Sequence, residues 1–237
     1  MKPVRTLLLF SALLALQPSG LFSDTLRLTP AQDAFVRSDN SVSENPRALA
    51  VANRGEGNIR RTLLQFELAP VIRSGRSVKS ATLLLIPLSR IGDAAAEPVP
   101  FAVWGVTGVK PAAWDEKTVI WETSPLAAAS LEVVTRTAGA VRLGSTEVDL
   151  SEARAFESRE PFRLSPERLA GYVNWALARG GSSSPLPAAP ALGEPLPIIT
   201  LVVTSEGGNK APGAAFYSKD NRPEARAVYP VLELILE

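Results

Sequence analysis

The sequence predicts an all-β protein, a jelly-roll-like β-sandwich with one short amphipathic helix. Roughly ten segments rich in β-branched and aromatic residues are separated by turn residues, a pattern typical of antiparallel sandwiches. In Arg61–Leu68 the residues alternate between an apolar face and a mixed face, as in a strand with one face in the core. Val78–Leu88 is the most apolar of these segments after the N-terminal run. We expect it to be a central strand that ends near Pro87, because proline cannot donate to a sheet.

The other strands follow from the same pattern. The Gly-rich segment Asn53–Asn58 is typical of a tight turn between two paired strands, whereas Val71–Gly75 and Ile91–Pro100 are expected to be irregular connections. The segments expected to be strands are Thr25–Leu28, Ala34–Val36, Ala48–Ala52, Arg61–Leu68, Val78–Leu88, Phe101–Thr107, Leu131–Thr135, Val148–Leu150, Ile198–Thr204, Ala214–Ser218 and Tyr229–Leu236, with Ala140–Leu143 as a further candidate.

One helix is expected between Ser165, a good N-cap followed by Pro166, and Gly180, which can end it. Its apolar stripe is formed by Leu169, Tyr172, Val173, Ala176 and Leu177. Trp175 lies off this stripe. We therefore expect Trp175 to be exposed or covered by the long Ser/Pro/Ala-rich loop Gly181–Pro197, with a structural role.

The first residues predict export. Lys2 and Arg5 precede an apolar run from Leu7 to Leu16, which is typical of a secretory signal peptide and about half the length that a membrane span needs. We expect residues 1–23 to be removed, leaving residues 24–237 as a single β-sandwich domain that is not inserted in a membrane. Secretion by a bacterium, to the periplasm or the outside, fits the absence of cysteine.

Composition excludes several functions. Without Lys2 and Arg5, 23 of the 25 basic residues remain against 24 acidic ones, so the basic surplus typical of nucleic-acid binding is missing. The chain has no histidine, which excludes Ser-His-Asp triads and most zinc sites. Asp115 and Glu116 are adjacent and point to opposite faces of an extended backbone, so they cannot flank one glycosidic bond. We therefore expect no enzyme.

The segment Trp114–Pro125 holds two of the four tryptophans. Trp114 is a candidate for stacking on a sugar ring, with packing in the core as the alternative. For Trp121 we favour a structural role, anchoring the core from a strand, because burying an indole removes about 150–250 Å² from water. Glu116 is expected to be structural too, holding its loop by accepting backbone N–H bonds.

Four arginines crowd the first third of the chain: Arg37, Arg54, Arg60 and Arg61. Arginine binds carboxylates through two parallel hydrogen bonds, so a patch of these side chains could hold a uronic-acid polymer. The alternative is four separate, solvated arginines on strand edges.

Further tentative ligand contacts are Tyr217, Lys219 and Arg222. Tyr217 and Lys219 share one strand face, so they could also abstract a proton as in a polysaccharide lyase. The alternative is that Tyr217 packs at a sheet edge while Lys219 is solvated. No cofactor is expected, with a structural calcium ion as an open alternative. Its oxygen ligands would come from Asp33, Asp39, Asn40, Glu44 and Asn45, or from Asp220 and Asn221.

Several segments, in order along the chain, resemble the DNRLRE-type domains, the group that includes the family-96 carbohydrate-binding modules. The clearest is Trp114–Trp121, which is similar to that family's Trp-x-Glu-x-Thr-x-x-Trp segment. The other similar segments are Asp33–Val36, Arg60–Leu68, Val78–Leu85, Val173–Trp175, Phe216–Ser218 and Tyr229–Leu234. The resemblance implies a β-sandwich on an exported microbial protein that accompanies polysaccharide breakdown. In such a family Trp114–Trp121 would be a framework segment.

The first hypothesis is therefore a secreted, non-catalytic module that binds an acidic polysaccharide. The second is a structural or adhesive protein that binds another protein or a matrix polymer. A polysaccharide lyase that uses Tyr217 is the third.

Overall fold

A computed structural model of the chain describes residues 24–41, 47–55, 57–93, 97–107, 114–125, 139–150, 160–180, 197–208, 210–220 and 229–237. Several sequence predictions lie outside these residues. They are the signal segment 1–23, the strand Leu131–Thr135, the ligand contact Arg222, the possible calcium ligands Glu44, Asn45 and Asn221, and nearly all of the loop Gly181–Pro197.

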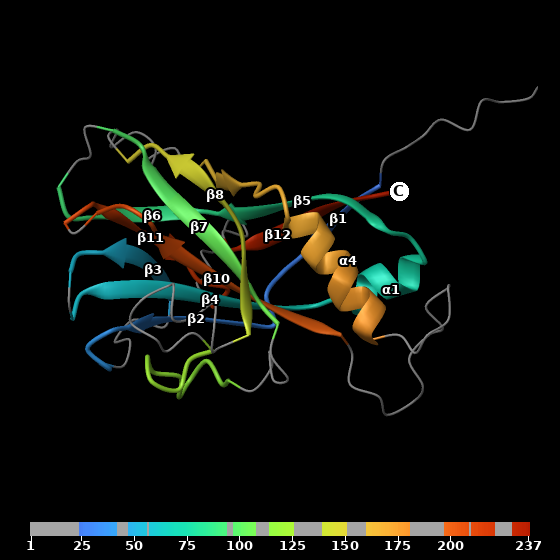
Figure 1. Cartoon of the computed structure of the whole chain (residues 1–237), viewed down its shortest axis with the longest axis horizontal. Coiled ribbons are helices and arrows are strands. Elements are labelled where there is room, and N and C mark those ends of the chain that lie inside the picture. Colours follow the sequence, from blue (N-terminus) through green and yellow to red (C-terminus); the bar gives the residue numbers. More distant parts are fainter. Residues whose placement is uncertain are drawn as a thin grey trace, which may run out of the picture.

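Two antiparallel sheets pack as a sandwich, which confirms the predicted fold class (Figure 1). The smaller sheet has the strand order β1-β12-β5-β9, and the larger has the order β6-β11-β3-β4-β10-β7-β8, with β2 paired to β4. The strands are β1 Thr25–Leu28, β2 Gln32–Arg37, β3 Ala48–Asn53, β4 Ile59–Glu67, β5 Val78–Leu85, β6 Pro87–Ile91, β7 Val99–Val106, β8 Ala140–Val148, β9 Phe162–Leu164, β10 Ile198–Ser205, β11 Gly213–Tyr217 and β12 Val231–Leu236.

The expected strand Val78–Leu88 is divided at Ile86. β5 lies between β12 and β9 in the smaller sheet, whereas β6 pairs with β11 in the larger one. β5 is thus an interior strand, as predicted, and the chain changes sheets next to Pro87. The proline marks this crossing, which periodicity alone did not reveal.

β8 replaces the two short strands expected at Ala140–Leu143 and Val148–Leu150. Its pairing with β7 changes register between Val103 and Trp104, opposite Arg142–Gly144. Such a bulge interrupts the alternation of inward and outward side chains, so the sequence pattern looks broken where the strand continues.

Two helices accompany the sheets in the described residues. α1, Ala69–Ser74, occupies the expected connection Val71–Gly75; it has a proline in its first turn and ends at Gly75 with φ 64°. α4, Leu169–Gly180, begins later than predicted. The Ser165 hydroxyl does not cap it, because Ser165 Oγ lies 2.9 Å from Thr82 Oγ1 on β5.

The inner face of the larger sheet packs against the smaller sheet and α4. Alternate residues of β4 and β7, such as Leu64, Phe66 and Val103, face Leu83 and Leu232 of the smaller sheet in one buried cluster. Burying side chains of this size contributes roughly 1.5–3 kcal/mol each. This cluster is the main core.

The outer face of the larger sheet is covered as well. Leu63, Trp104 and Val202 form a second buried cluster with Trp114 and Trp121, which belong to the segment 114–125. That segment therefore closes the open side of the larger sheet.

Candidate ligand-binding site

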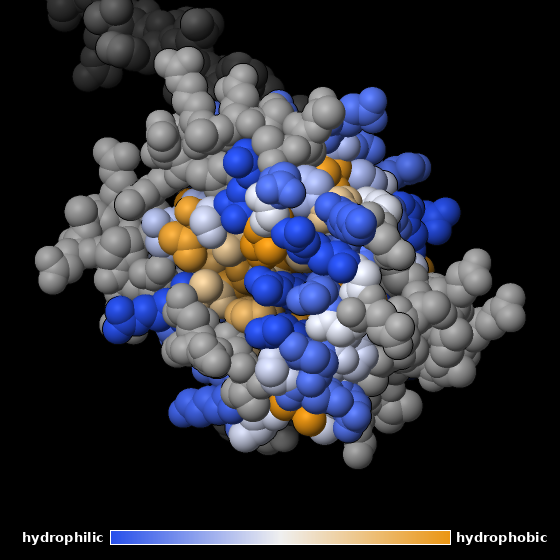
Figure 2. Space-filling model, turned by 90° about the vertical axis from the view of Figure 1, so that its left-hand side faces the viewer, coloured by the Kyte–Doolittle hydropathy of each residue, from blue (hydrophilic) through white to orange (hydrophobic). Residues whose placement is uncertain are grey.

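Three of the four predicted arginines gather at one end of the larger sheet. Arg37 ends β2 and lies directly opposite Arg60 in the β2–β4 register, and Arg54 directly follows β3. Burial lowers the pKa of Arg60, and the charges of Arg37 and Arg54 lower it further. We call Arg37, Arg54 and Arg60 the arginine cluster. In Figure 2, which views the end with the β3–β4 turn, hydrophilic side chains border an apolar strip.

Asp39 provides local compensation for part of this charge. Arg37 donates to Asp39 Oδ2 at 2.6 Å, while Ser41 donates its backbone N–H and its hydroxyl to Asp39 Oδ1. These bonds from Ser41, together with Arg37, hold the pKa of Asp39 below its usual value. Arg37 Nε is buried and has no acceptor within the described residues. Asp39 thus forms an ion pair with Arg37, one of the three cations in the cluster.

Arg54 packs against a glycine. The Arg54 guanidinium lies so close to Gly92, which has φ 89°, that a Cβ atom at Gly92 would come within 2.1 Å of Arg54 Nη1. The positive φ favours glycine here, and a side chain at this position would have to displace the end of the Arg54 side chain. The sequence marks Gly92 only as part of a loop, and no local signal connects it with Arg54.

Arg61 is not part of the arginine cluster. Successive side chains of a strand point to opposite faces, so Arg61 enters the outer cluster beside Leu63 and is only 3% exposed. Its Cζ lies 4.2 Å from the centroid of the Trp121 ring. Burial lowers the pKa of Arg61 to about 10. Arg61 supports packing, so the prediction of a ligand contact at Arg61 is wrong, and so is the alternative that this arginine is solvated.

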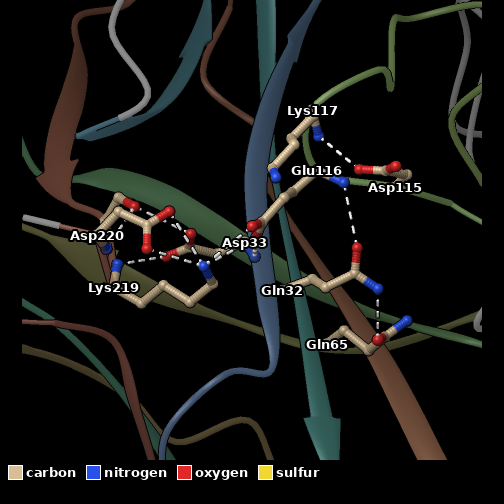
Figure 3. A network of polar contacts seen from close by, with 9 residues as sticks. Gln32, Asp33, Gln65, Asp115, Glu116, Lys117, Lys219 and Asp220 are labelled. Atoms are coloured by element: carbon tan, nitrogen blue, oxygen red, sulfur yellow. Dashed lines mark hydrogen bonds and ion pairs between the residues drawn. The ribbon is translucent and has the colours of Figure 1, made fainter.

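A polar network connects β2, the segment 114–125 and the chain after β11 (Figure 3). Asp33 is buried on β2 and accepts hydrogen bonds from Ser218 Oγ at 3.0 Å and from the Lys219 backbone N–H at 2.6 Å. Burial raises the pKa of Asp33 to about 6, although both hydrogen bonds oppose the shift. Glu116 Oε2 in turn accepts the backbone N–H of Asp33 at 3.2 Å. Glu116 therefore connects its loop to β2 by accepting a backbone N–H.

Lys219 is the cation of this network. Its Nζ lies 2.9 Å from Glu116 Oε2 and 3.0 Å from Asp220 Oδ1. Burial lowers the pKa of Lys219, but the hydrogen bonds to Glu116 and Asp220 outweigh it, so the pKa is raised overall. Lys219 is thus an ammonium ion held between carboxylates. Tyr217 is partly buried and its backbone N–H donates to Ile86 O at 3.1 Å.

The structure does not group the possible calcium ligands as the sequence suggested. Asp33 and Asp220, which belonged to different candidate sites, have carboxylate oxygens within 4.8 Å of each other and of Glu116. These three residues could hold a cation, but the Lys219 ammonium already contacts two of them. Asn40 is turned elsewhere and donates to Glu122 Oε1 at 2.7 Å. Glu44, Asn45 and Asn221 lie outside the described residues.

The two tryptophans of segment 114–125 pack against the larger sheet. Trp114 is 6% exposed and its Nε1 lies 3.4 Å from Thr200 Oγ1 on β10. Its ring therefore shows no open face for a sugar. Trp121 is also buried, but the prediction that it belongs to a strand is wrong, because the segment consists of turns. Asp115 explains this difference: its side chain accepts the Lys117 N–H and its carbonyl accepts the Val119 N–H, which favours a turn.

Residues 24–151, more than half of the 237, match the model of carbohydrate-binding module family 96. The chain belongs to this family. The matched part contains the arginine cluster, Glu116 and both tryptophans of segment 114–125, whereas α4, Tyr217 and Lys219 lie beyond it. No match is found among curated proteins.

Family 96 supports a carbohydrate as the partner, and carbohydrate-binding modules are usually non-catalytic and often extracellular. No helix among the described residues has the length and apolar character that a membrane crossing needs.

Proposed function

We propose that this protein binds an acidic polysaccharide through Arg37, Arg54 and Arg60. The observation that carries the proposal is the direct juxtaposition of Arg37 and Arg60 across β2 and β4, with Arg54 close enough to lower the pKa of Arg60. Like charges directly opposite on neighbouring strands destabilise a sheet by roughly 0.2–1 kcal/mol. An anionic ligand would relieve this repulsion.

The chemistry of the cluster favours carboxylates. A guanidinium group presents several N–H donors in a plane and forms paired hydrogen bonds with a carboxylate. A uronic polymer repeats a carboxylate along its chain, so several weak contacts can act together. Among the described residues Asp39 forms an ion pair with Arg37, so the described part of the cluster retains positive charge for such a ligand.

The state of Lys219 supports a non-catalytic role. A base must be deprotonated near neutral pH, whereas Glu116 and Asp220 stabilise the Lys219 ammonium. Lys219 is therefore not available as a neutral amine that could abstract a proton together with Tyr217. For this reason we favour binding over the lyase hypothesis.

Export and domain organisation complete the proposal. The composition of residues 1–23 supports secretion. We also infer that residues 24–237 form one domain, because β12 pairs with both β1 and β5 and β10 pairs with both β4 and β7.

The test is retardation in native gels that contain alginate, polygalacturonate, xylan or glucan. Alginate or polygalacturonate should retard the wild type most, and Arg37→Gln/Arg54→Gln/Arg60→Gln should lose this excess. Arg73→Gln on α1, at the other end of the molecule in Figure 1, is a matched control that removes an exposed arginine. Equal retardation by acidic and neutral polymers, or an unaffected triple variant, would contradict the proposal. Retardation by none would favour the adhesive or structural role.

A further inference from the structure

A pocket lies between α4 and the paired strands β7 and β8, away from the arginine cluster: in Figure 1, α4 lies on the right and the β3–β4 turn on the left. Its volume is about 430 Å³, within the range typical of small-ligand sites. The lining residues are Thr107, Val141, Leu143, Glu167, Arg168, Gly171, Tyr172 and Trp175. None of them belongs to the arginine cluster or to the Asp33 network.

Two glycines shape this region. Tyr172 packs onto Gly105 of β7 so closely that a Cβ atom there would lie 2.6 Å from the tyrosine ring. The Tyr172 hydroxyl donates to Val106 O at 2.7 Å, which fixes α4 against the end of β7. Gly171, by contrast, faces open space within the described part of the chain, since a Cβ atom there would meet none of the described atoms within 4 Å. Because Gly171 lines the pocket, a larger side chain at this position would extend into this space.

Trp175 borders the pocket and is the exposed tryptophan of this chain. It is 37% exposed, whereas Trp104, Trp114 and Trp121 are buried. Its ring lies 5.6 Å from the Tyr172 ring at an angle of 20°, and Arg179 Cζ lies 4.8 Å from its centroid. Contacts from both neighbouring turns of α4 thus hold the indole in one orientation, and a preorganised group binds at a lower entropic cost.

We infer that this pocket binds one pyranose ring of a polysaccharide. A pyranose has apolar C–H faces and a rim of hydroxyl groups. The faces pack on an apolar surface, and the hydroxyl groups form hydrogen bonds with polar groups around that surface. Val141, Leu143 and Trp175 provide the apolar surface. Glu167 and Arg168 provide an acceptor and a fork of donors at the rim.

The charges indicate that this site differs from the arginine cluster. Glu167 and Arg168 are adjacent residues of opposite charge, so the rim does not select for an anionic sugar. Binding here should be insensitive to salt, whereas binding at the arginine cluster should weaken as salt rises. The inference goes beyond the proposed function and does not depend on it.

The test uses cellohexaose, mannohexaose and xylohexaose as neutral probes, followed by tryptophan fluorescence and by calorimetry. At least one probe should bind saturably, and Gly171→Leu, which fills the open space, should weaken that binding by about tenfold or more. Gly171→Ala is the matched control, since its methyl group meets no neighbour. Trp175→Ala, followed by calorimetry, should weaken binding too, and it keeps the inference testable if Gly171→Leu fails to fold.

Other outcomes would overturn the inference. It fails if none of the three probes binds saturably, or if Gly171→Leu folds and binds like the wild type. The variant Arg37→Gln/Arg54→Gln/Arg60→Gln should retain neutral-sugar binding, so failure of the arginine proposal and failure of this one are distinguishable.

Discussion

Replacing Asp33 with Asn should change how the stability of the protein depends on pH. Asp33 is buried, and its pKa of about 6 in the folded protein lies above the ordinary value of 3.8. The folded state therefore binds a proton more tightly than the unfolded state. This stabilises the folded state at low pH, and the contribution is lost as the pH rises through about 6. A shift of about two pKa units corresponds to about 3 kcal/mol.

The measurement is urea unfolding of the wild type and Asp33→Asn at several pH values between 4 and 7. The variant cannot titrate at this position, so the free energy of unfolding of the wild type should fall relative to it by up to about 3 kcal/mol over this range. Asp93→Asn removes an exposed carboxyl group and should leave the pH profile of the wild type unchanged. The reasoning would be refuted if the difference in the free energy of unfolding between Asp33→Asn and the wild type were constant with pH. It would also be refuted if the wild type became more stable relative to the variant as the pH rises.

Three further substitutions test the packing and the polar network. Trp121→Ala removes a buried indole and the ring beneath Arg61, and should lower the free energy of unfolding by about 3–5 kcal/mol; Trp121→Phe should cost less, and equal losses would contradict the cation–π contact. Gly105→Ala should displace Tyr172 and cost about 1–3 kcal/mol in urea unfolding, while Gly171→Ala should cost nothing; a neutral Gly105→Ala would contradict the tight packing. Lys219→Met removes the cation shared by Glu116 and Asp220 and should lower the free energy of unfolding by about 1–3 kcal/mol, which thermal unfolding would show as a lower midpoint temperature. An unchanged midpoint would show that the network adds no stability.

The sequence reveals the strands where alternation is undisturbed and turn residues flank them. Thr25–Leu28 is predicted to the residue, and the turn Asn53–Asn58 joins β3 and β4 as expected. The change of sheet at Ile86 and the bulge in β8 escape prediction because both depend on which strand lies alongside. The late start of α4 has a similar cause, since the Ser165 hydroxyl forms a hydrogen bond with Thr82 of β5 and does not cap the helix.

The site is predicted less completely than the fold. Alternation along β4 separates Arg60 from Arg61, and it could have been applied to the sequence once the strand was assigned. The pairing of Arg37 with Arg60 depends on the register of β2 on β4, and the contact of Arg54 with Gly92 joins two different loops. The meeting of Asp33, Glu116 and Lys219 likewise joins residues that are up to 186 positions apart.

The most direct test of the central claim is the salt dependence of binding to alginate or polygalacturonate, whichever retards the protein more. Calorimetry of the wild type at several NaCl concentrations should show Kd rising with salt, because exposed charges are screened over about 8–10 Å near physiological ionic strength. In Arg37→Gln/Arg54→Gln/Arg60→Gln, binding should be weak and should lose most of this dependence. A triple variant that binds with the affinity and salt dependence of the wild type would contradict the account.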